Sequence, residues 1–233
     1  MSEHKKRELR RALGAAFPHT IPVLTGFLVL GFAYGVLMQT KGYGVLWAFL
    51  MSAIAFCGSM QFVAITLLTT VFNPIQAFLL SIMVNARHLF YGLSMLSKYK
   101  GLGKIRFFLI YTLCDETFSI ACSIEPETGV NRKYFYFFIS CLNYSYWVTA
   151  TVIGSLVGSY IKFNTKGLDF VLTALFLVLF LEQWKKKENR WSAIIGIVCS
   201  AITLLVVGQE NFVIPAMAFI LLTLTIGRNK ICN

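Results

Sequence analysis

The chain has 233 residues, of which 57% are hydrophobic and only 13% are charged. An average soluble domain carries about 25% charged residues, so this composition excludes an ordinary soluble domain and indicates an integral membrane protein. The net charge of +11 lies mainly in short links between long apolar runs. This distribution excludes a nucleic-acid partner, favours contact with anionic membrane lipids and carries topology information.

The six cysteines show no paired spacing and no Cys/His spacing typical of a metal site. Five of them fall within apolar runs, where a cysteine is expected to act as a small packing residue. The sequence therefore predicts no disulfide framework, no metal and no cofactor. No small-residue cleavage pattern follows a short apolar stretch, so the first apolar run is expected to remain as an anchor.

Three regions are expected along the chain. Residues 1–20 are a basic segment, which the positive-inside rule places in the cytoplasm. Residues 21–227 form one transmembrane domain in the cell membrane, and residues 228–233 form a short tail. The apolar runs predict an all-α, polytopic bundle of about eight segments, with seven as the alternative.

The first run, about 21–40, is expected to begin beside Pro18 and Pro22, because proline is tolerated in the first turn of a helix. This run and the fifth each contain two glycines spaced one helical turn apart. Such GxxxG pairs favour close packing of another helix over contact with a substrate path. The glycines are Gly31, Gly35, Gly154 and Gly158.

The second run, about 45–71, holds Gly58, Ser59 and Gln61 near its midpoint. A flexible residue and two hydrogen-bonding side chains at this depth favour a break in the helix. Transporters bind substrates at such breaks, where free backbone N–H groups suit a carboxylate. The alternative is an unbroken helix that uses Gly58 for packing.

The third and fourth runs, about 74–96 and 105–124, carry full charges near their centres, which is costly in a bilayer. If both runs are helices, each charged site lies roughly 15–17 Å from the link at Gly101, about half the thickness of a bilayer core. The two sites are therefore expected to meet at one depth. They consist of Asn85, Arg87 and His88 on one run and Asp115 and Glu116 on the other.

The fifth run, about 134–160, places Asn143 among tyrosines and a tryptophan. These residues either line an internal wall or anchor the helix at the interface, and Asn143 is the better candidate for a wall. The remaining runs, about 168–184, 191–208 and 212–226, have almost no interior charge and are expected to form scaffold. Pro215 lies in the first turn of the last run.

The basic residues test the topology. Eight crossings with a cytoplasmic N-terminus place 13 basic residues inside and 7 outside. If run 45–71 alone does not cross, the split becomes 11 against 9. If both 45–71 and 105–124 are re-entrant, it becomes 17 against 3, so broken or re-entrant segments stay open.

The central charges suggest a binding chemistry. The Arg87 guanidinium can hold a carboxylate through two parallel hydrogen bonds, and Asp115 or Glu116 can neutralise it when the site is empty. His88 and the two acids are the groups able to gain and lose protons. The alternatives are a static Arg87–Asp115 pair that only fixes the fold, and a His88 that donates to a backbone carbonyl without titrating.

Four motifs give the chain a family resemblance. It resembles the large subunit of the AzlC-type branched-chain amino-acid permeases and exporters at residues 55–62, 85–92, 114–118 and 167–170, which read AFCGSMQF, NARHLFYG, CDETF and GLDF. Cys114 stands where the family pattern has threonine before the acidic pair. The resemblance implies proton-coupled export of leucine, isoleucine, valine and similar neutral amino acids, with a small AzlD-type membrane subunit as partner.

Two groups of site residues are expected for such a transporter. The residues expected to bind the substrate are Gly58, Ser59, Gln61, Asn85, Arg87 and Asn143. Those expected to couple protons or act as counter-ions are His88, Asp115 and Glu116. Two other classes stay open. One is a non-transporting membrane assembly subunit, for which the basic links and glycine faces only hold partners. The other is an intramembrane enzyme using His88 with Asp115 or Glu116, although no nucleophile or metal motif accompanies them.

Overall fold

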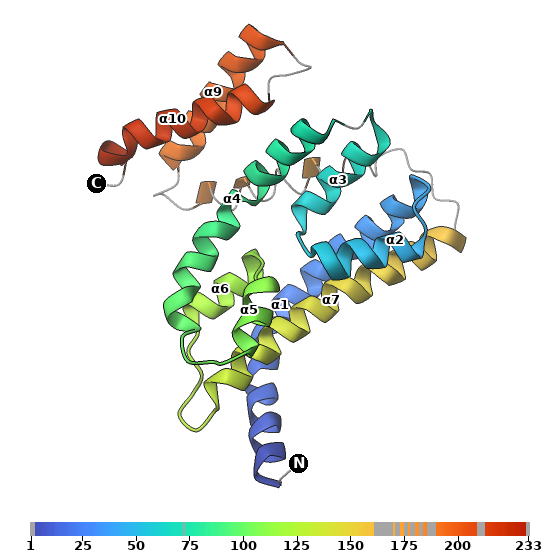
Figure 1. The fold of residues 1–233 in the computed structure, drawn as a ribbon, viewed down its shortest axis with the longest axis vertical. Helices are drawn as coiled ribbons and strands as arrows, with labels where there is room; N and C mark the ends of the chain where they lie inside the picture. The colour runs from blue at the N-terminus through green and yellow to red at the C-terminus, as the bar shows by residue number, and fades with distance from the viewer. Residues whose placement is uncertain are drawn as a thin grey trace. The chain divides into compact units, whose positions relative to one another are not determined.

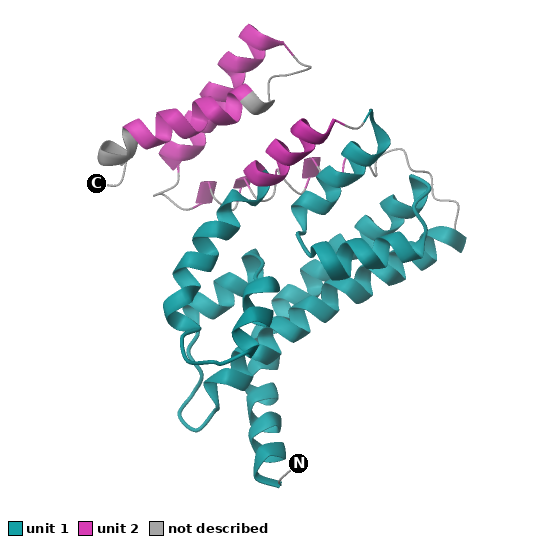
Figure 2. Ribbon diagram, viewed as in Figure 1, with its two compact units in different colours: residues 1–72, 84–168 teal, residues 73–83, 169–233 magenta. Residues whose placement is uncertain are grey.

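The computed structural model describes residues 3–71, 73–160, 170, 173–174, 177, 180–181, 184–185, 190–208 and 213–231. These residues form helices and no strand (Figure 1), which agrees with the predicted all-α class. They divide into two compact units, residues 1–72 with 84–168 and residues 73–83 with 169–233 (Figure 2).

The first helix, α1 (Glu3–Thr40), is longer than predicted and contains Pro18 and Pro22 in its interior. The prediction that the helix starts near residue 21 is therefore wrong, whereas the start of the membrane-spanning part stays a prediction. Proline removes one helix hydrogen bond, the one to the carbonyl four residues earlier, here those of Gly14 and Pro18. The helix nevertheless continues through both positions.

Helix α7 (Arg132–Tyr160) packs along α1, and the two helices run parallel (Figure 1). A Cβ atom added at Gly31 would meet Ala150, and one added at Gly35 or Gly154 would collide with the backbone of the facing helix. Close approach therefore requires glycine at these positions. The prediction that the GxxxG pairs pack helices is confirmed, and the two pairs pack in the same interface.

The second run is broken, as the residues around Gly58 suggested. Helix α2 (Val45–Leu50) continues into the π-helix η1 (Met51–Ala55), and α3 begins only at Ser59 and ends at Thr69. Between them Phe56 and Gly58 have φ angles of 38° and 41°. Left-handed φ values end a right-handed helix, and glycine adopts them without steric cost.

The third run is the continuous helix α4 (Pro74–Lys98), close to its predicted limits. The fourth run, however, is also broken. It consists of α5 (Ile105–Tyr111) and α6 (Asp115–Ser123), so Asp115 and Glu116 form the first turn of a helix and not the middle of one. At about 1.5 Å per residue, each half of a broken run spans at most about half of a bilayer core.

Unit 2 contains α9 (Arg190–Val207) and α10 (Val213–Ile231). The two helices are antiparallel neighbours, with Cys199 Sγ 3.6 Å from Thr223 Oγ1. Most of the predicted run 168–184 lies outside the described residues, as do residues 167–169 of the GLDF motif and the end of the tail. The proposed limits at residues 20 and 227 stay predictions.

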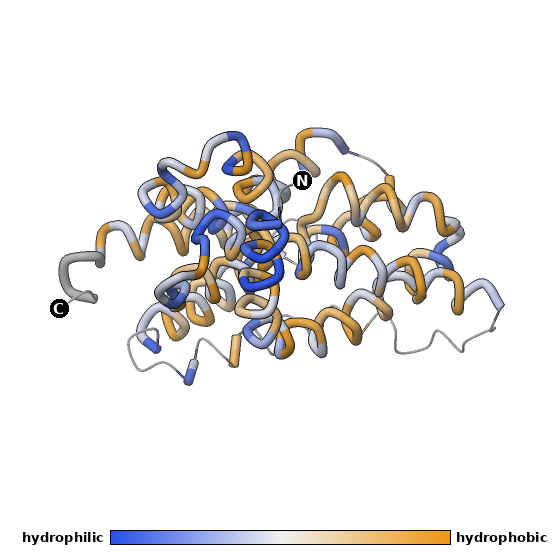
Figure 3. The backbone as a smooth tube through the Cα atoms, turned by 90° about the horizontal axis from the view of Figure 1, so that it is seen from below, coloured by the Kyte–Doolittle hydropathy of each residue, from blue (hydrophilic) through white to orange (hydrophobic). Residues whose placement is uncertain are grey.

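Three of the described helices are long and apolar enough to cross a membrane, namely α1, α4 and α9. Orange, hydrophobic segments occur along most of the helices, with white and blue stretches between them (Figure 3). These features indicate a membrane protein. The predicted number of about eight segments is not confirmed, since the two broken runs each give two shorter pieces.

Candidate functional site

Arg87 joins the N-terminal ends of two half-helices. Its Nη1 lies 2.7 Å from Asp115 Oδ2, and its Nη2 donates to Ser59 Oγ at 2.9 Å. Ser59 is the first residue of α3 and Asp115 is the first residue of α6. The expected meeting of Arg87 and Asp115 is therefore found, although one partner comes from the break in its run.

The two helix starts give this region an anion-binding character. Among the described residues, no side chain caps the N-terminus of α3 or α6. Free N–H groups and the aligned peptide dipoles make a helix N-terminus favourable for negative charge. On α6 the helix's own Asp115 and Glu116 use this effect. No acidic residue lies in the first turn of α3. The Met60 and Gln61 N–H groups of that turn donate to the Cys57 and Gly58 carbonyls at 2.9 and 3.0 Å, so this N-terminus offers an external carboxylate its helix dipole more than free donors.

Asn143 lies beside the break before α6. Its Nδ2 donates to Thr117 Oγ1 at 3.0 Å, and this hydroxyl lies 3.1 Å from Cys114 Sγ. Both Asn143 and Thr117 are fully buried. The predicted inward orientation of Asn143 is what the structure shows, and the contact positions α7 against the start of α6.

Gln61 belongs to a different group of contacts. Its Nε2 donates to Ser52 Oγ at 3.1 Å, and its Oε1 accepts from Trp147 Nε1 at 2.8 Å. The side chains of Gln61 and Ser52 are fully buried, and Trp147 is 4% exposed. Gln61 therefore ties α3 to η1 and α7, and its role in substrate binding stays a prediction. Trp147 faces the interior and does not act as an interface anchor.

Two tyrosines support the first break: Tyr144, which belongs to the aromatic group around Asn143, and Tyr111, which the sequence did not single out. Tyr111 OH donates to the carbonyls of Ala53 and Ile54 at 2.6 and 2.7 Å. Tyr144 OH donates to the Ala53 carbonyl at 2.8 Å. A helix end leaves its last carbonyls without partners, and in lipid such groups are costly. Only the distances across the fold could have identified these donors.

The other predicted residues surround Arg87 without pairing with it. His88 packs edge-on against Tyr91, with ring centroids 5.7 Å apart, and Tyr91 stacks on Phe118 at 4.2 Å. Glu116 follows Asp115 in the first turn of α6. Within the described residues, the ion pair of Arg87 is with Asp115 and not with Glu116.

Buried polar atoms near the pair are left with unused bonding capacity. Arg87 Nε, Asn85 Oδ1 and Asn143 Oδ1 are buried and have no hydrogen-bond partner among the described residues. Such atoms are uncommon in proteins and are costly unless another group satisfies them. A donor and two acceptors are therefore available to a polar ligand beside the Arg87–Asp115 pair.

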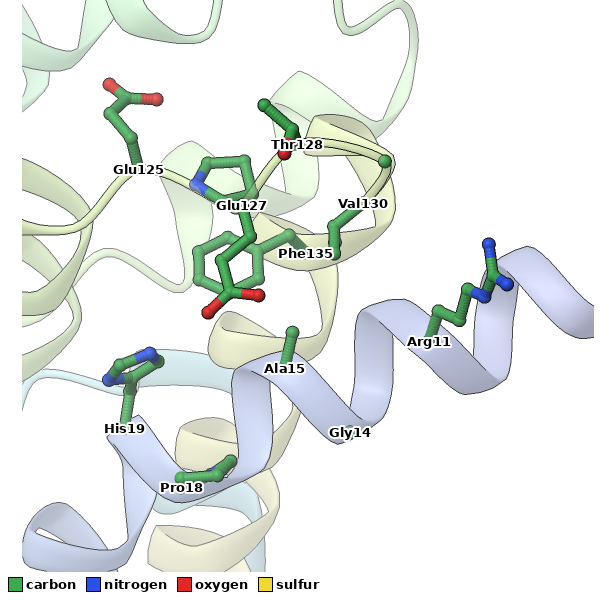
Figure 4. A pocket seen from close by; sticks show the side chains of 12 residues that line it. Arg11, Gly14, Ala15, Pro18, His19, Glu125, Glu127, Thr128, Val130 and Phe135 are labelled. Carbon is green, nitrogen blue, oxygen red and sulfur yellow. The ribbon is translucent and has the colours of Figure 1, made fainter.

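A separate cavity of about 510 Å³ lies between α1 and residues 125–130 (Figure 4). In the close-up, the Glu127 carboxylate points toward α1 near Ala15 and His19, whereas Arg11 points away. None of the predicted site residues lines this cavity. The charged pair at Arg87 and this cavity are thus distinct features of unit 1.

Known proteins resemble the chain over nearly its whole length. It is 47% identical to the branched-chain amino acid transport protein AzlC of Bacillus subtilis over 98% of this chain and 90% of the relative. It is 39% identical to an uncharacterized membrane protein of Haemophilus influenzae, covering 96% and 92% of the two chains. The inner membrane protein YgaZ of Escherichia coli is 27% identical over 73% of this chain and 72% of its own length. No solved structure matches.

The family model described as AzlC protein matches residues 22–161. This range contains α7, α4, both broken runs and the Arg87–Asp115 pair. It also contains the GxxxG pairs through which α1 and α7 pack. The family match and the extended identity agree with a transport protein and not with an enzyme. The chain belongs to the AzlC family of membrane proteins.

Proposed function

We propose that this protein is a secondary transporter that exports branched-chain and similar neutral amino acids. The Arg87–Asp115 pair between two helix N-termini is the observation that carries the proposal. An amino acid presents one carboxylate and one ammonium group, and this pair offers an opposite charge to each. The Bacillus relative is named a branched-chain amino acid transport protein, which supports the same substrate class.

The proposed binding mode uses the unsatisfied atoms. The substrate carboxylate binds Arg87, whose Nε is a free donor, and the positive end of the α3 dipole beside Gly58 and Ser59 stabilises it further. The ammonium group binds Asp115 with Glu116. In the empty site Asp115 neutralises Arg87, so substrate binding exchanges one ionic partner for another and leaves no isolated charge in the membrane.

Export is proposed to use the proton gradient, with His88, Asp115 and Glu116 as the groups that exchange protons. Asn85 and Asn143 contribute the free amide oxygens that orient the ammonium group. A small AzlD-type membrane subunit is the proposed partner. We propose that the complex lies in the cell membrane with the N-terminus of this chain in the cytoplasm.

Reconstitution tests this function. The protein, purified with its small subunit, is placed in proteoliposomes, and flux of radiolabelled leucine is measured under an imposed pH gradient. We expect flux above that of empty vesicles, its loss in Arg87→Ala and its retention in the matched surface variant Lys100→Ala. Absence of flux with the intact complex contradicts amino-acid transport. Flux that ignores the pH gradient contradicts only the proton coupling.

A further inference from the structure

The broken run 45–69 is folded back on itself. Tyr43 OH, just before α2, donates to the Leu68 carbonyl near the end of α3 at 3.0 Å. In a straight helix these residues would lie about 37 Å apart. Gln61 and Ser52, which a straight helix would separate by about 13 Å, are joined by a hydrogen bond of 3.1 Å. The chain therefore enters and leaves this hairpin at the same end, and the break at Phe56–Gly58 is its tip.

The broken run 105–123 has the same form. Lys98 Nζ, before α5, donates to the Cys122 carbonyl at the end of α6 at 3.2 Å, whereas a straight helix would place these residues about 36 Å apart. Ile105, at the start of α5, packs against the same hydrophobic cluster as Ile124, just after α6. This second hairpin also opens at one end, and its tip lies at residues 112–114.

The two hairpins open at opposite ends of the parallel pair α1 and α7. The first follows α1, whose last turn contacts the last turns of α7 through Gln39 and Gly158. The second opens at Lys98, whose carbonyl accepts a hydrogen bond of 3.1 Å from Arg132 at the start of α7. The tips meet between these ends, where Tyr111 binds the carbonyl of Ala53.

The sequences of the two hairpins, each with the end of the helix before it, also resemble one another. Seven residues recur at a constant spacing of 57 positions, in the same order and without an insertion or deletion between the two copies. In each copy a long helix ends near the repeated lysine, and the repeated cysteine lies at a hairpin tip. The matching residues are Tyr34 and Tyr91, Gly35 and Gly92, Met38 and Met95, Lys41 and Lys98, Gly44 and Gly101, Cys57 and Cys114, and Ala64 and Ala121.

We infer that residues 34–69 and 91–123 are two repeats of inverted topology. Their hairpins are re-entrant, approach the Arg87 site from opposite faces of the membrane and do not cross it. In the first repeat α1 runs toward the Thr40 end, and in the second residues 84–98 of α4 run back toward the Lys98 end. Each hairpin is the barrier between the central site and its own face of the membrane, an arrangement suited to alternating access.

Charge supports this topology. Through residue 160, eleven basic residues outside the central site fall at the Lys98 end and one, Lys41, falls at the other. The positive-inside rule then makes the Lys98 end cytoplasmic. The eleven are Lys5, Lys6, Arg7, Arg10, Arg11, Lys98, Lys100, Lys104, Arg106, Arg132 and Lys133. If both broken runs crossed the membrane, the four from Lys98 to Arg106 would lie outside.

Cysteine labelling in intact cells decides between re-entrant and crossing hairpins, and it needs no knowledge of the substrate. In a variant lacking the native cysteines, single cysteines are placed at two exposed positions, Val71→Cys after the first hairpin and Lys104→Cys before the second. A membrane-impermeant maleimide is then applied from outside. We expect Val71→Cys to react at once and Lys104→Cys to react only after permeabilisation.

If the hairpins cross the membrane, residue 71 lies inside and residue 104 lies outside. Protection of Val71→Cys or outside labelling of Lys104→Cys therefore overturns the inference. Lys41→Cys and Glu3→Cys are the matched controls, because both topologies place the first outside and the second inside. These controls verify the orientation of the inserted chain. Loss of leucine transport with the expected labelling would contradict the proposed function alone.

Discussion

Arg87 on α4 and Asp115 at the start of α6 form an ion pair of 2.7 Å, and the same guanidinium donates to Ser59 at the start of α3. One side chain thus holds the starts of two half-helices from different hairpins. The side chains of Arg87 and Asp115 are 35% and 27% exposed, so the pair remains accessible to a polar ligand.

Arg87→Lys tests the geometry of this contact. Lysine keeps the positive charge but lacks the planar donor pair and the free Nε of arginine. Losing a charge-assisted hydrogen bond costs about 1.5–3 kcal/mol, which corresponds to a roughly 10- to 100-fold weaker apparent affinity. Leucine flux at a series of substrate concentrations gives the KM, which measures this apparent affinity. An unchanged KM would show that Arg87 does not anchor the carboxylate.

Removing one partner of the pair should also destabilise the fold. Arg87→Gln leaves Asp115 unpaired, at a cost below the roughly 3–5 kcal/mol of a fully buried pair because both groups are partly exposed. The double variant Arg87→Gln with Asp115→Asn should recover thermal stability in detergent and still lack transport. Recovery of both properties would support a static structural pair.

Gly154→Ala tests the packing of α1 against α7. The added methyl group would collide with the backbone of Phe32, which cannot move aside as a flexible side chain can. Overpacking of this kind costs about 1–3 kcal/mol, so the unfolding temperature should fall. Gly26→Ala is the control, since open space surrounds that position on α1. Equal unfolding temperatures for the two variants would contradict the close helix contact.

Tyr111→Phe tests the contact between the two hairpin tips. It removes one hydroxyl donor, whose single hydrogen is shared between the Ala53 and Ile54 carbonyls, so the loss corresponds to one hydrogen bond, about 0.5–1.5 kcal/mol. Tyr144→Phe removes the second donor to Ala53, so the pair of variants should be non-additive. Tyr160→Phe, at an 86% exposed position, is the control and should leave the unfolding temperature unchanged.

The ion pairs of Glu125 with Lys98 and Arg132 should make the folding stability of the protein depend on pH. A hydrogen bond from Lys98 lowers the pKa of Glu125, with help from the Tyr136 hydroxyl and the charge of Arg132. A lowered folded-state pKa means that the stabilisation is present above the usual glutamate pKa of about 4.3 and disappears as the pH falls below it.

The stability difference between the native protein and Glu125→Gln should therefore be measurable at pH 7 and vanish at acidic pH. It should be small, because exposed ion pairs contribute at most about 1 kcal/mol. Unfolding temperatures across this pH range provide the measurement. Glu127→Gln makes the same charge change outside the described ion pairs and should show no such dependence.

Some of the structure follows from local sequence alone. Long apolar runs can only be membrane or core helices, because backbone groups need internal hydrogen bonds in lipid. Gly58 predicted a break because glycine adopts a left-handed φ angle without strain. For the second run, the distribution of basic residues left a broken or re-entrant segment open, but the break could not be located because Thr112, Leu113 and Cys114 include no glycine or proline. The start of α1 was missed because a proline removes a single helix hydrogen bond and does not by itself end a long helix.

The sequence by itself indicated that charged residues from two neighbouring runs meet, and Arg87 and Asp115 do form an ion pair, although the helix-rise argument had assumed an unbroken fourth run. It could not determine that each broken run turns back. That reversal depends on partners distant in the sequence, such as Tyr111 with Ala53 and Tyr43 with Leu68. Local propensity sets where a helix can break, but only the tertiary contacts that satisfy the freed carbonyl groups decide the direction in which the chain continues.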